Sequence, residues 1–188
     1  MAQLILIKHG MPELVPSVLP GQWHLSETGR EQAKLLGARL AEYAPELLVS
    51  SDEVKAIETA RLAAPALGLE PAVVPGLHEH PRVSTGFPAW SVIVDGVGRF
   101  YATPGEVVFG EESADAAYQR FANAVEGLLA AHPDRTIAVV AHGVVICNFI
   151  GRRAGVDPFA LWSRLSTTGF CVLSLPDFRL EQVVERVS

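Results

Sequence analysis

Uninterrupted apolar runs alternate with helical apolar stripes along most of the chain. The first run, residues 4–7 (LILI), passes directly into Lys-His-Gly at residues 8–10. Residues 46–51 (ELLVSS) end in two serines, and residues 135–143 (RTIAVVAHG) end in a second His-Gly pair. Such runs predict strands that are buried on both faces. Residues 71–80 (PAVVPGLHEH) predict another short strand, again followed by polar residues.

Four segments carry apolar residues at helical spacing. Ser26 and Thr28 offer N-cap oxygens for the first helix, and Thr28 with Glu31 forms a capping-box pattern. In the second helix, Pro65 is expected to shorten or kink the last turn. The predicted helices run from these caps to about residue 44, from about 53 to 67, from 113 to about 131, and from 144 to a glycine at 155.

The last quarter of the chain and one long connection have different patterns. Residues 169–175, a Pro-Asp turn and residues 179–187 predict an antiparallel pair of strands. Residues 81–112 contain five glycines and three prolines, and SVIV at 91–94 is a candidate strand within them. A connection of this length predicts an inserted lid or small subdomain within a single domain over residues 1–188. The alternation of strands and helices predicts an α/β fold with a mostly parallel sheet.

Composition and charge narrow the classes of function. Of the 188 residues, 49% are apolar and 19% are charged, which is typical of a compact globular domain. The formal net charge of -6 offers no positive surface field for nucleic acid or an anionic membrane. An anionic ligand would therefore need a local site.

The N-terminal residues and the two cysteines favour a cytoplasmic protein. No segment has the pattern of a signal peptide or of a membrane span of about 20 apolar residues. Cys147 and Cys171 lie among apolar residues, which favours small core residues in a reducing compartment, although their pairing stays open.

Two histidines have matching surroundings. His9 and His142 each follow a predicted buried strand and precede a glycine. If the two strands are neighbours in a parallel sheet, both side chains emerge at the edge where α/β proteins bind ligands. Gly10 and Gly143 would let a ligand approach the backbone closely. One histidine at a strand end is usually structural, but two with the same flanks favour a shared site.

The ordered motifs resemble those of the histidine phosphatase superfamily, which includes cofactor-dependent phosphoglycerate mutases and many small phosphatases. The matching segments are KHG (8–10), LSETGREQA (25–33), SSDEVKAIETA (50–60), LHE (77–79), GEES (110–113) and VVAHG (139–143). The resemblance implies a phosphoglycerate mutase-like three-layer sandwich, in which helices flank a mostly parallel central sheet.

The resemblance also implies a metal-independent phosphatase that hydrolyses a small phosphomonoester through a phosphohistidine on His9. Nucleophilic catalysis of this kind divides one difficult step into two easier ones. His142 would stabilise the phosphoryl oxygens, and Glu79 would protonate the leaving oxygen and later activate water. The residues expected to bind the phosphate are Lys8, Lys55, His142 and Gly143. No cofactor is needed.

Two positions depart from the family pattern, because Lys8 and Lys55 stand where the family has arginines. A guanidinium binds phosphate through a planar fork, whereas an ammonium is a compact point charge. The change motivates a second hypothesis, a catalytically weakened relative that binds phosphorylated ligands or a protein partner. A phosphoglycerate mutase-type phosphotransferase is a third option, less favoured because residues 81–109 offer few basic side chains for a second phosphate.

Other polar residues near these motifs have plainer interpretations. His78 and His80 form a His-x-His pair, but no third ligand adjoins them, so we expect no metal site. Ser50 and Ser51 are expected to end a strand and accept local hydrogen bonds, and His24 to be a loop residue. We expect a small phosphorylated substrate as partner, with no nucleic acid and no membrane, and a homodimer stays open. The sequence does not identify the substrate.

Overall fold

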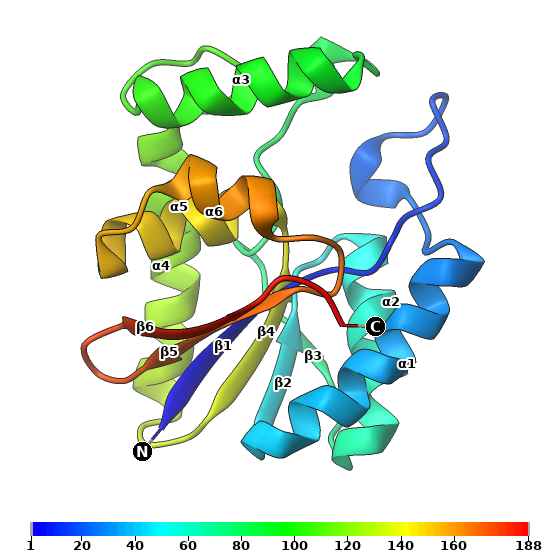
Figure 1. The fold of residues 1–188 in the computed structure, drawn as a ribbon, viewed down its shortest axis with the longest axis vertical. Helices are drawn as coiled ribbons and strands as arrows, with labels where there is room; N and C mark the ends of the chain where they lie inside the picture. Colours follow the sequence, from blue (N-terminus) through cyan, green and yellow to red (C-terminus); the bar gives the residue numbers. More distant parts are fainter. Residues whose placement is uncertain (1, 188) are drawn as a thin grey trace.

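A six-stranded sheet forms the centre of the computed structural model, which describes residues 2–187 (Figure 1). The strands are β1 (Gln3–Lys8), β2 (Leu47–Ser50), β3 (Ala72–Val73), β4 (Ile137–Ala141), β5 (Phe170–Ser174) and β6 (Arg179–Val184). Their order across the sheet is β3-β2-β4-β1-β5-β6. The first four are mutually parallel, while β5 and β6 are antiparallel to their neighbours. The α/β fold with a mostly parallel sheet and an antiparallel C-terminal pair is therefore confirmed.

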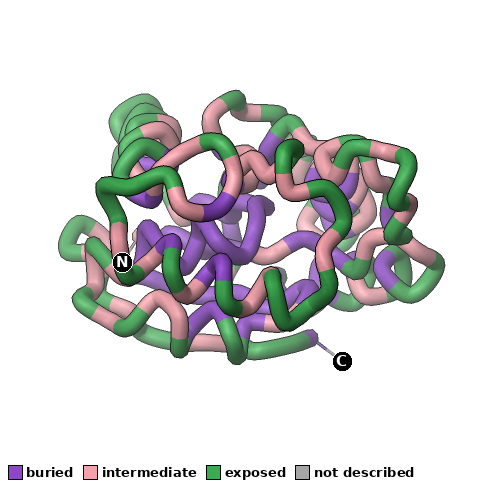
Figure 2. The backbone as a smooth tube through the Cα atoms, turned by 90° about the horizontal axis from the view of Figure 1, so that it is seen from above, coloured by how far each residue is buried: buried purple, intermediate pink, exposed green. Residues whose placement is uncertain are grey.

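Helices cover both faces of this sheet, which gives the three expected layers. On one face, Ile5, Ile7 and Val140 pack against the helices α1 (Glu27–Leu40) and α2 (Val54–Leu67). Alternate residues of the same strands, among them Leu4, Leu6 and Val139, point into the core of the opposite face. The helices of that second layer are α3 (Trp90–Ala102), α4 (Ala114–Ala131), α5 (Gly143–Ala154) and α6 (Pro158–Arg164). Figure 2 shows the buried residues gathered in the middle of the molecule, beneath exposed helices and loops.

Most predicted helix boundaries are confirmed by capping contacts. Ser113 caps α4 by accepting a hydrogen bond from Ala116 N, and Gly155 ends α5 with a left-handed backbone, φ 70°. Ser26 caps α1, whereas Thr28 lies inside the helix. The helix α1 ends at Leu40 and is continued by the short 3-10 helix η2 (Ala41–Tyr43). Pro65 does not shorten α2, which continues to Leu67.

The prediction of a strand at SVIV is wrong, because these residues lie in the helix α3. Three β-branched apolar residues in a row, 92–94, favoured a strand when considered alone. Over a longer window, Ile93, Val97 and Phe100 recur at helical spacing and pack into the core. Four residues are therefore too few to distinguish the helical repeat of apolar positions from that of a strand.

Three further elements were not predicted as such. The helix α6 begins at Pro158, with Asp157 as its N-cap. Two short 3-10 helices, η1 (Pro20–Gln22) and η3 (Val83–Thr85), lie before α1 and at the start of the 81–112 segment. The ends of the 81–112 segment are tied together, because Glu111 accepts hydrogen bonds from the backbone N–H groups of Val83 and Ser84. Its role as a lid or subdomain stays a prediction.

The predictions about the two cysteines and about membrane-spanning segments can be compared with the structure. Cys147 and Cys171 are both buried free thiols, as expected for core residues. Over residues 2–187, none of the helices combines the length and apolarity that a membrane crossing requires.

Candidate active site

The carboxyl ends of β1 and β4 bring His9 and His142 together. The two strands pair in parallel with Lys8 opposite Ala141, so that the next residue of each strand leaves the sheet at the same edge (Figure 1). The two imidazole centroids are 5.2 Å apart. His9 is 8% exposed and His142 is completely buried. The juxtaposition expected from the matching His-Gly flanks is therefore present.

Local contacts set the tautomer of His9. Its Nδ1 lies 2.7 Å from the carbonyl oxygen of Gly10, and a carbonyl can only accept, so Nδ1 carries the proton. Burial lowers the pKa of His9 well below its ordinary value, and the neighbouring His142 and the Lys55 ammonium lower it further. His9 is thus a neutral imidazole whose Nε2 has a free lone pair.

His142 forms a hydrogen bond with Ser51, a serine that was not predicted to belong to the site. The Oγ atom of Ser51 lies 2.6 Å from Nε2 of His142 and also accepts a hydrogen bond from Glu53 N–H. Ser51 therefore supports the second imidazole, which goes beyond the local bonds expected of it. Burial, with Lys55 as a further influence, holds the pKa of His142 well below its ordinary value, so this ring is also neutral. Its Nδ1 is buried and has no partner among residues 2–187.

Lys8 lies beside the N-terminus of α5. Its ammonium donates a hydrogen bond to Leu165 O at 2.8 Å. A Cβ atom built on Gly143 would lie 3.2 Å from Lys8 Cε, so the glycine leaves room for the lysine side chain. Burial lowers the pKa of Lys8, and Cys147 and Glu79 oppose this effect only in part.

Lys55 approaches the site from the first turn of α2 and is 5% exposed. Its ammonium donates to Pro20 O at 2.7 Å and forms an ion pair with Glu53. Lys55 and Lys8 both act on His9, as their influence on its pKa shows. The two predicted phosphate-binding lysines are therefore brought to the same site.

Glu79 is anchored to the N-terminus of α5. Its two carboxylate oxygens accept hydrogen bonds from Val144 N at 3.1 Å and Val145 N at 3.2 Å, and one also accepts from His80 N. A carboxylate is favourable at a helix N-terminus, where backbone N–H groups lack intrahelical partners. Because α5 begins directly after His142, this anchoring keeps Glu79 next to the paired imidazoles.

Glu53 is a site residue that sequence reasoning missed. Its carboxylate pairs with Lys55, accepts a hydrogen bond from Glu79 N at 2.7 Å and lies 3.5 Å from Nε2 of His142. Burial raises the pKa of Glu53, but Lys55 and the hydrogen bonds outweigh burial and lower it overall. The available signal was an acidic residue two positions before the expected phosphate-binding lysine.

Two other histidines near the motifs, His80 and His24, have partners outside this arrangement. His80 packs on Phe100, with ring centroids 4.3 Å apart, and residues 78–80 belong to no strand that would align the two rings of the His-x-His pair. His24 is an exposed loop residue that pairs with Glu58. Within the described chain, no group of three His, Cys, Asp or Glu side chains is placed to hold a metal ion.

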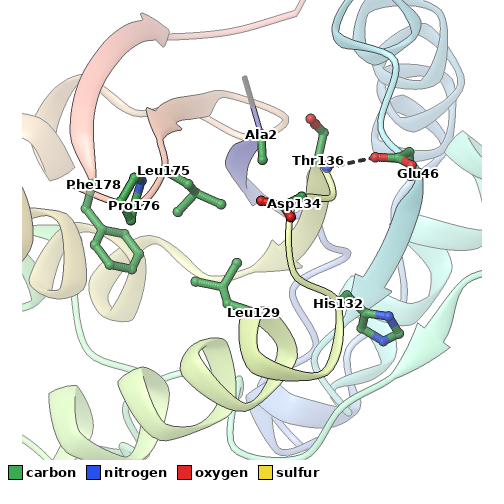
Figure 3. Close-up of a pocket in the computed structure, with 9 residues that line it drawn as sticks. All are labelled: Ala2, Glu46, Leu129, His132, Asp134, Thr136, Leu175, Pro176 and Phe178. Atoms are coloured by element: carbon green, nitrogen blue, oxygen red, sulfur yellow. Dashed lines mark hydrogen bonds between the residues drawn. The ribbon is translucent and has the colours of Figure 1, made fainter.

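A separate cavity of about 770 Å³ lies at the opposite edge of the sheet, as Figure 3 shows. It is formed beside the amino ends of β1, β2 and β4, and Leu129, Leu175 and Phe178 give it an apolar floor. Neither of the paired histidines lines it. The paired histidines instead lie at the carboxyl ends of the parallel strands, where ligands of α/β sheets bind.

The assembled site combines one unprotonated imidazole nitrogen with a second neutral imidazole. Two ammonium groups, Lys8 and Lys55, and two carboxylates, Glu53 and Glu79, surround them. Such a set is suited to nucleophilic attack on an anionic group, with a carboxylate at hand for proton transfer.

Comparisons with known proteins show the family and the fold of this chain. Residues 4–185 match the family model described as the histidine phosphatase superfamily (branch 1). Phosphoserine phosphatase 1 of Hydrogenobacter thermophilus is 29% identical over 179 residues, which cover 87% of this chain and 81% of that protein. A mycobacterial glucosyl-3-phosphoglycerate phosphatase, solved in complex with VO3, superposes with a TM-score of 0.79 at 26% identity over all of both chains. A phosphoserine phosphatase mutant of Entamoeba histolytica, 19% identical, has the same fold, with a TM-score of 0.79 over 98% of this chain and 97% of the other.

Proposed function

The chain belongs to the histidine phosphatase superfamily (branch 1), and from this premise we propose that it hydrolyses a small phosphomonoester through a phosphohistidine on His9. The observation that carries the proposal is the bond between His9 Nδ1 and Gly10 O, 2.7 Å, beside a second neutral histidine. It leaves the lone pair of Nε2 free for attack on phosphorus.

In the first step, His9 Nε2 forms a bond to phosphorus while the bond from phosphorus to the ester oxygen breaks. Glu79, which α5 holds next to His142, begins this step as the protonated acid, gives its proton to the leaving oxygen and becomes a carboxylate. In the second step, the Glu79 carboxylate takes a proton from water, the water oxygen forms a bond to phosphorus, and the bond from phosphorus to His9 Nε2 breaks. Inorganic phosphate, neutral His9 and protonated Glu79 result.

His142 stabilises the phosphoryl oxygens during transfer. A neutral imidazole has one N–H. The hydroxyl of Ser51 accepts from Glu53 N–H and has one O–H to donate, and we assign that O–H to Nε2 of His142. The proton of His142 then resides on Nδ1, the buried nitrogen that has no partner in the described part of the chain. That N–H is free to donate to a phosphoryl oxygen.

Lys8 and Lys55 supply positive charge in place of the family's arginines. Each ammonium has three N–H donors. Lys8 uses one of them on Leu165 O, whereas Lys55 uses two, on Pro20 O and Glu53. Lys8 therefore keeps more donors for the phosphate than Lys55 does.

The substrate is a small phosphorylated molecule, of the class that the names of the relatives describe: phosphoserine and glucosyl-3-phosphoglycerate. We place recognition of its leaving group in the 81–112 segment, acting as a lid or small subdomain. The proposal needs no cofactor, and it places the protein in the cytoplasm as a monomer or a homodimer.

The pairing of Lys55 with Glu53 favours a second candidate, a relative that binds phosphorylated ligands with weak or no turnover. An ammonium already bound to a carboxylate contributes less to phosphate alignment than a free guanidinium fork. This candidate shares the site but not the phosphohistidine.

The test is hydrolysis of para-nitrophenyl phosphate in the presence of a chelator. Wild-type protein is compared with His9→Ala and with His132→Ala, whose side chain lies in the cavity at the far edge of the sheet. Turnover by the wild type and His132→Ala, with none by His9→Ala, is the expected result. Turnover that survives in His9→Ala would refute the phosphohistidine, and phosphate binding without turnover in any variant would favour the second candidate.

A further inference from the structure

Glu53 is the N-cap residue of α2. Its carboxylate makes no hydrogen bond to the backbone N–H groups of the first turn. The side chain turns into the site instead, where it is 13% exposed and pairs with the Lys55 ammonium. A charged group that is largely buried, and not used for capping, calls for another role.

Every polar contact of the Glu53 carboxylate is with a group of the proposed phosphate site. One oxygen pairs with the ammonium of Lys55. The other accepts from Glu79 N–H at 2.7 Å and lies 3.5 Å from Nε2 of His142. An ammonium and a backbone N–H are donors that phosphoryl oxygens also use.

Glu53 offsets part of the positive charge of the site before any ligand arrives. Lys8 and Lys55 contribute two positive charges, and Glu53 contributes a negative charge that pairs with Lys55. The low pKa values of His9 and His142 leave both rings neutral. Without Glu53, the net charge of the same pocket would be more positive by one unit toward an incoming phosphate.

We propose that Glu53 is an internal anion that competes with the phosphoryl group for Lys55 and keeps inorganic phosphate weakly bound. The inference rests on the proposed function in placing the phosphoryl group beside His9. Its consequence is that the product leaves readily, because the carboxylate of Glu53 takes Lys55 back as phosphate departs.

Glu53→Gln is the decisive substitution, because it removes the charge and keeps the shape. The amide oxygen can still accept from Glu79 N–H or from Lys55, so the backbone contacts of the site are preserved. Removing a full negative charge a few ångströms from a phosphate dianion is expected to tighten its binding by about tenfold or more. Glu53→Ala, which deletes the carboxylate by truncation, is a second variant with the same expected direction.

The experiment is calorimetric titration of inorganic phosphate into wild-type protein, Glu53→Gln and Glu53→Ala. The matched control is Glu70→Gln, which makes the same change in net charge at an exposed position. We expect tighter phosphate binding in both Glu53 variants and no change in the control. The gain should disappear in the double variant Glu53→Gln/Lys55→Met, because the competition is for Lys55.

Affinity that is unchanged or weaker in the Glu53 variants overturns the inference, and so does equal tightening in Glu70→Gln. Hydrolysis by the same proteins separates this failure from failure of the proposed function. Phosphate that binds more tightly to Glu53→Gln in a protein without His9-dependent turnover supports the inference and refutes the hydrolase. His9-dependent turnover by the wild type, together with unchanged phosphate affinity in Glu53→Gln, supports the hydrolase and refutes the inference about Glu53. If phosphate binds to none of the proteins, the inference is refuted.

Discussion

His80 should make the stability of this protein fall in mildly acidic solution. Its side chain is 1% exposed, and both ring nitrogens lack hydrogen-bond partners in the part of the chain that is described. The ring packs between Phe100 and Phe109, with centroid distances of 4.3 Å and 5.9 Å. Burial lowers the pKa of His80 to about 4, and the charge of Arg82 contributes to the same shift.

The size of the effect follows from the two pKa values of His80. The folded protein binds the proton only near pH 4, whereas the unfolded chain binds it near the ordinary value of 6.5. The unfolded state therefore gains a proton first, and stability is complete above pH 6.5 and lost as the pH falls toward 4. A difference of about 2.5 pKa units at 1.36 kcal/mol each corresponds to about 3 kcal/mol, of which about 2 kcal/mol is lost by pH 5.

The assay is urea unfolding of wild-type protein and His80→Leu at pH 7.5 and pH 5. Because His9 and His142 are also buried and neutral, the informative quantity is the difference between the two proteins. That difference in unfolding free energy should shift by about 2 kcal/mol in favour of His80→Leu on going to pH 5. Phe170→Leu alters core packing on the other face of the sheet, against Tyr43, and leaves the surroundings of His80 intact, so its effect should be equal at both pH values. A difference between wild type and His80→Leu that does not change with pH would refute the reasoning.

Two further predictions concern catalysis. Ser51→Ala removes the hydroxyl that directs the proton of His142 to Nδ1, so phosphate affinity and kcat should each fall by about tenfold or more. Ser51→Thr keeps a hydroxyl and should restore both. An unchanged phosphate affinity in Ser51→Ala would contradict this role. Glu79→Gln should still transfer phosphate from para-nitrophenyl phosphate, whose leaving group needs no proton, but should hydrolyse the phosphohistidine about 10²-fold more slowly. Rapid-mixing measurements should then show a burst of nitrophenolate, and a steady-state rate equal to that of the wild type would exclude Glu79 as the base.

Local sequence determined much of the architecture. The uninterrupted apolar runs at β1 and β4 are buried because strands at the centre of a sheet are covered on both faces. The caps of α4 and α5 were predictable, since Ser113 and Gly155 act on neighbouring backbone groups. The matching His-Gly flanks were sufficient to bring His9 and His142 to one edge, because parallel neighbouring strands end at the same edge.

Structural features that depend on a longer stretch of sequence, or on contacts between distant residues, were not predicted. In α3, the β-branched residues of SVIV favoured a strand, and only their spacing relative to Phe100 and the packing of that face produce a helix. The helix α6 is seven residues long, too short for a periodic pattern, and depends on its N-cap and on contacts such as the stacking of Trp162 with Trp90.

The tertiary structure alone decided how the polar residues of the site are connected. Ser51 and His142 are 91 positions apart in the chain, yet their side chains lie 2.6 Å apart. Glu53 resembled an ordinary residue before a helix, and its pairing with Lys55 and its contact with Glu79 depend on where α2 meets the loop after β3. The hydrophobic period of a strand or helix is a local property and can be read from the sequence. The orientation of a buried charged side chain depends on which hydrogen-bond donors the fold brings near it, because an unpaired charge in the protein interior costs too much free energy.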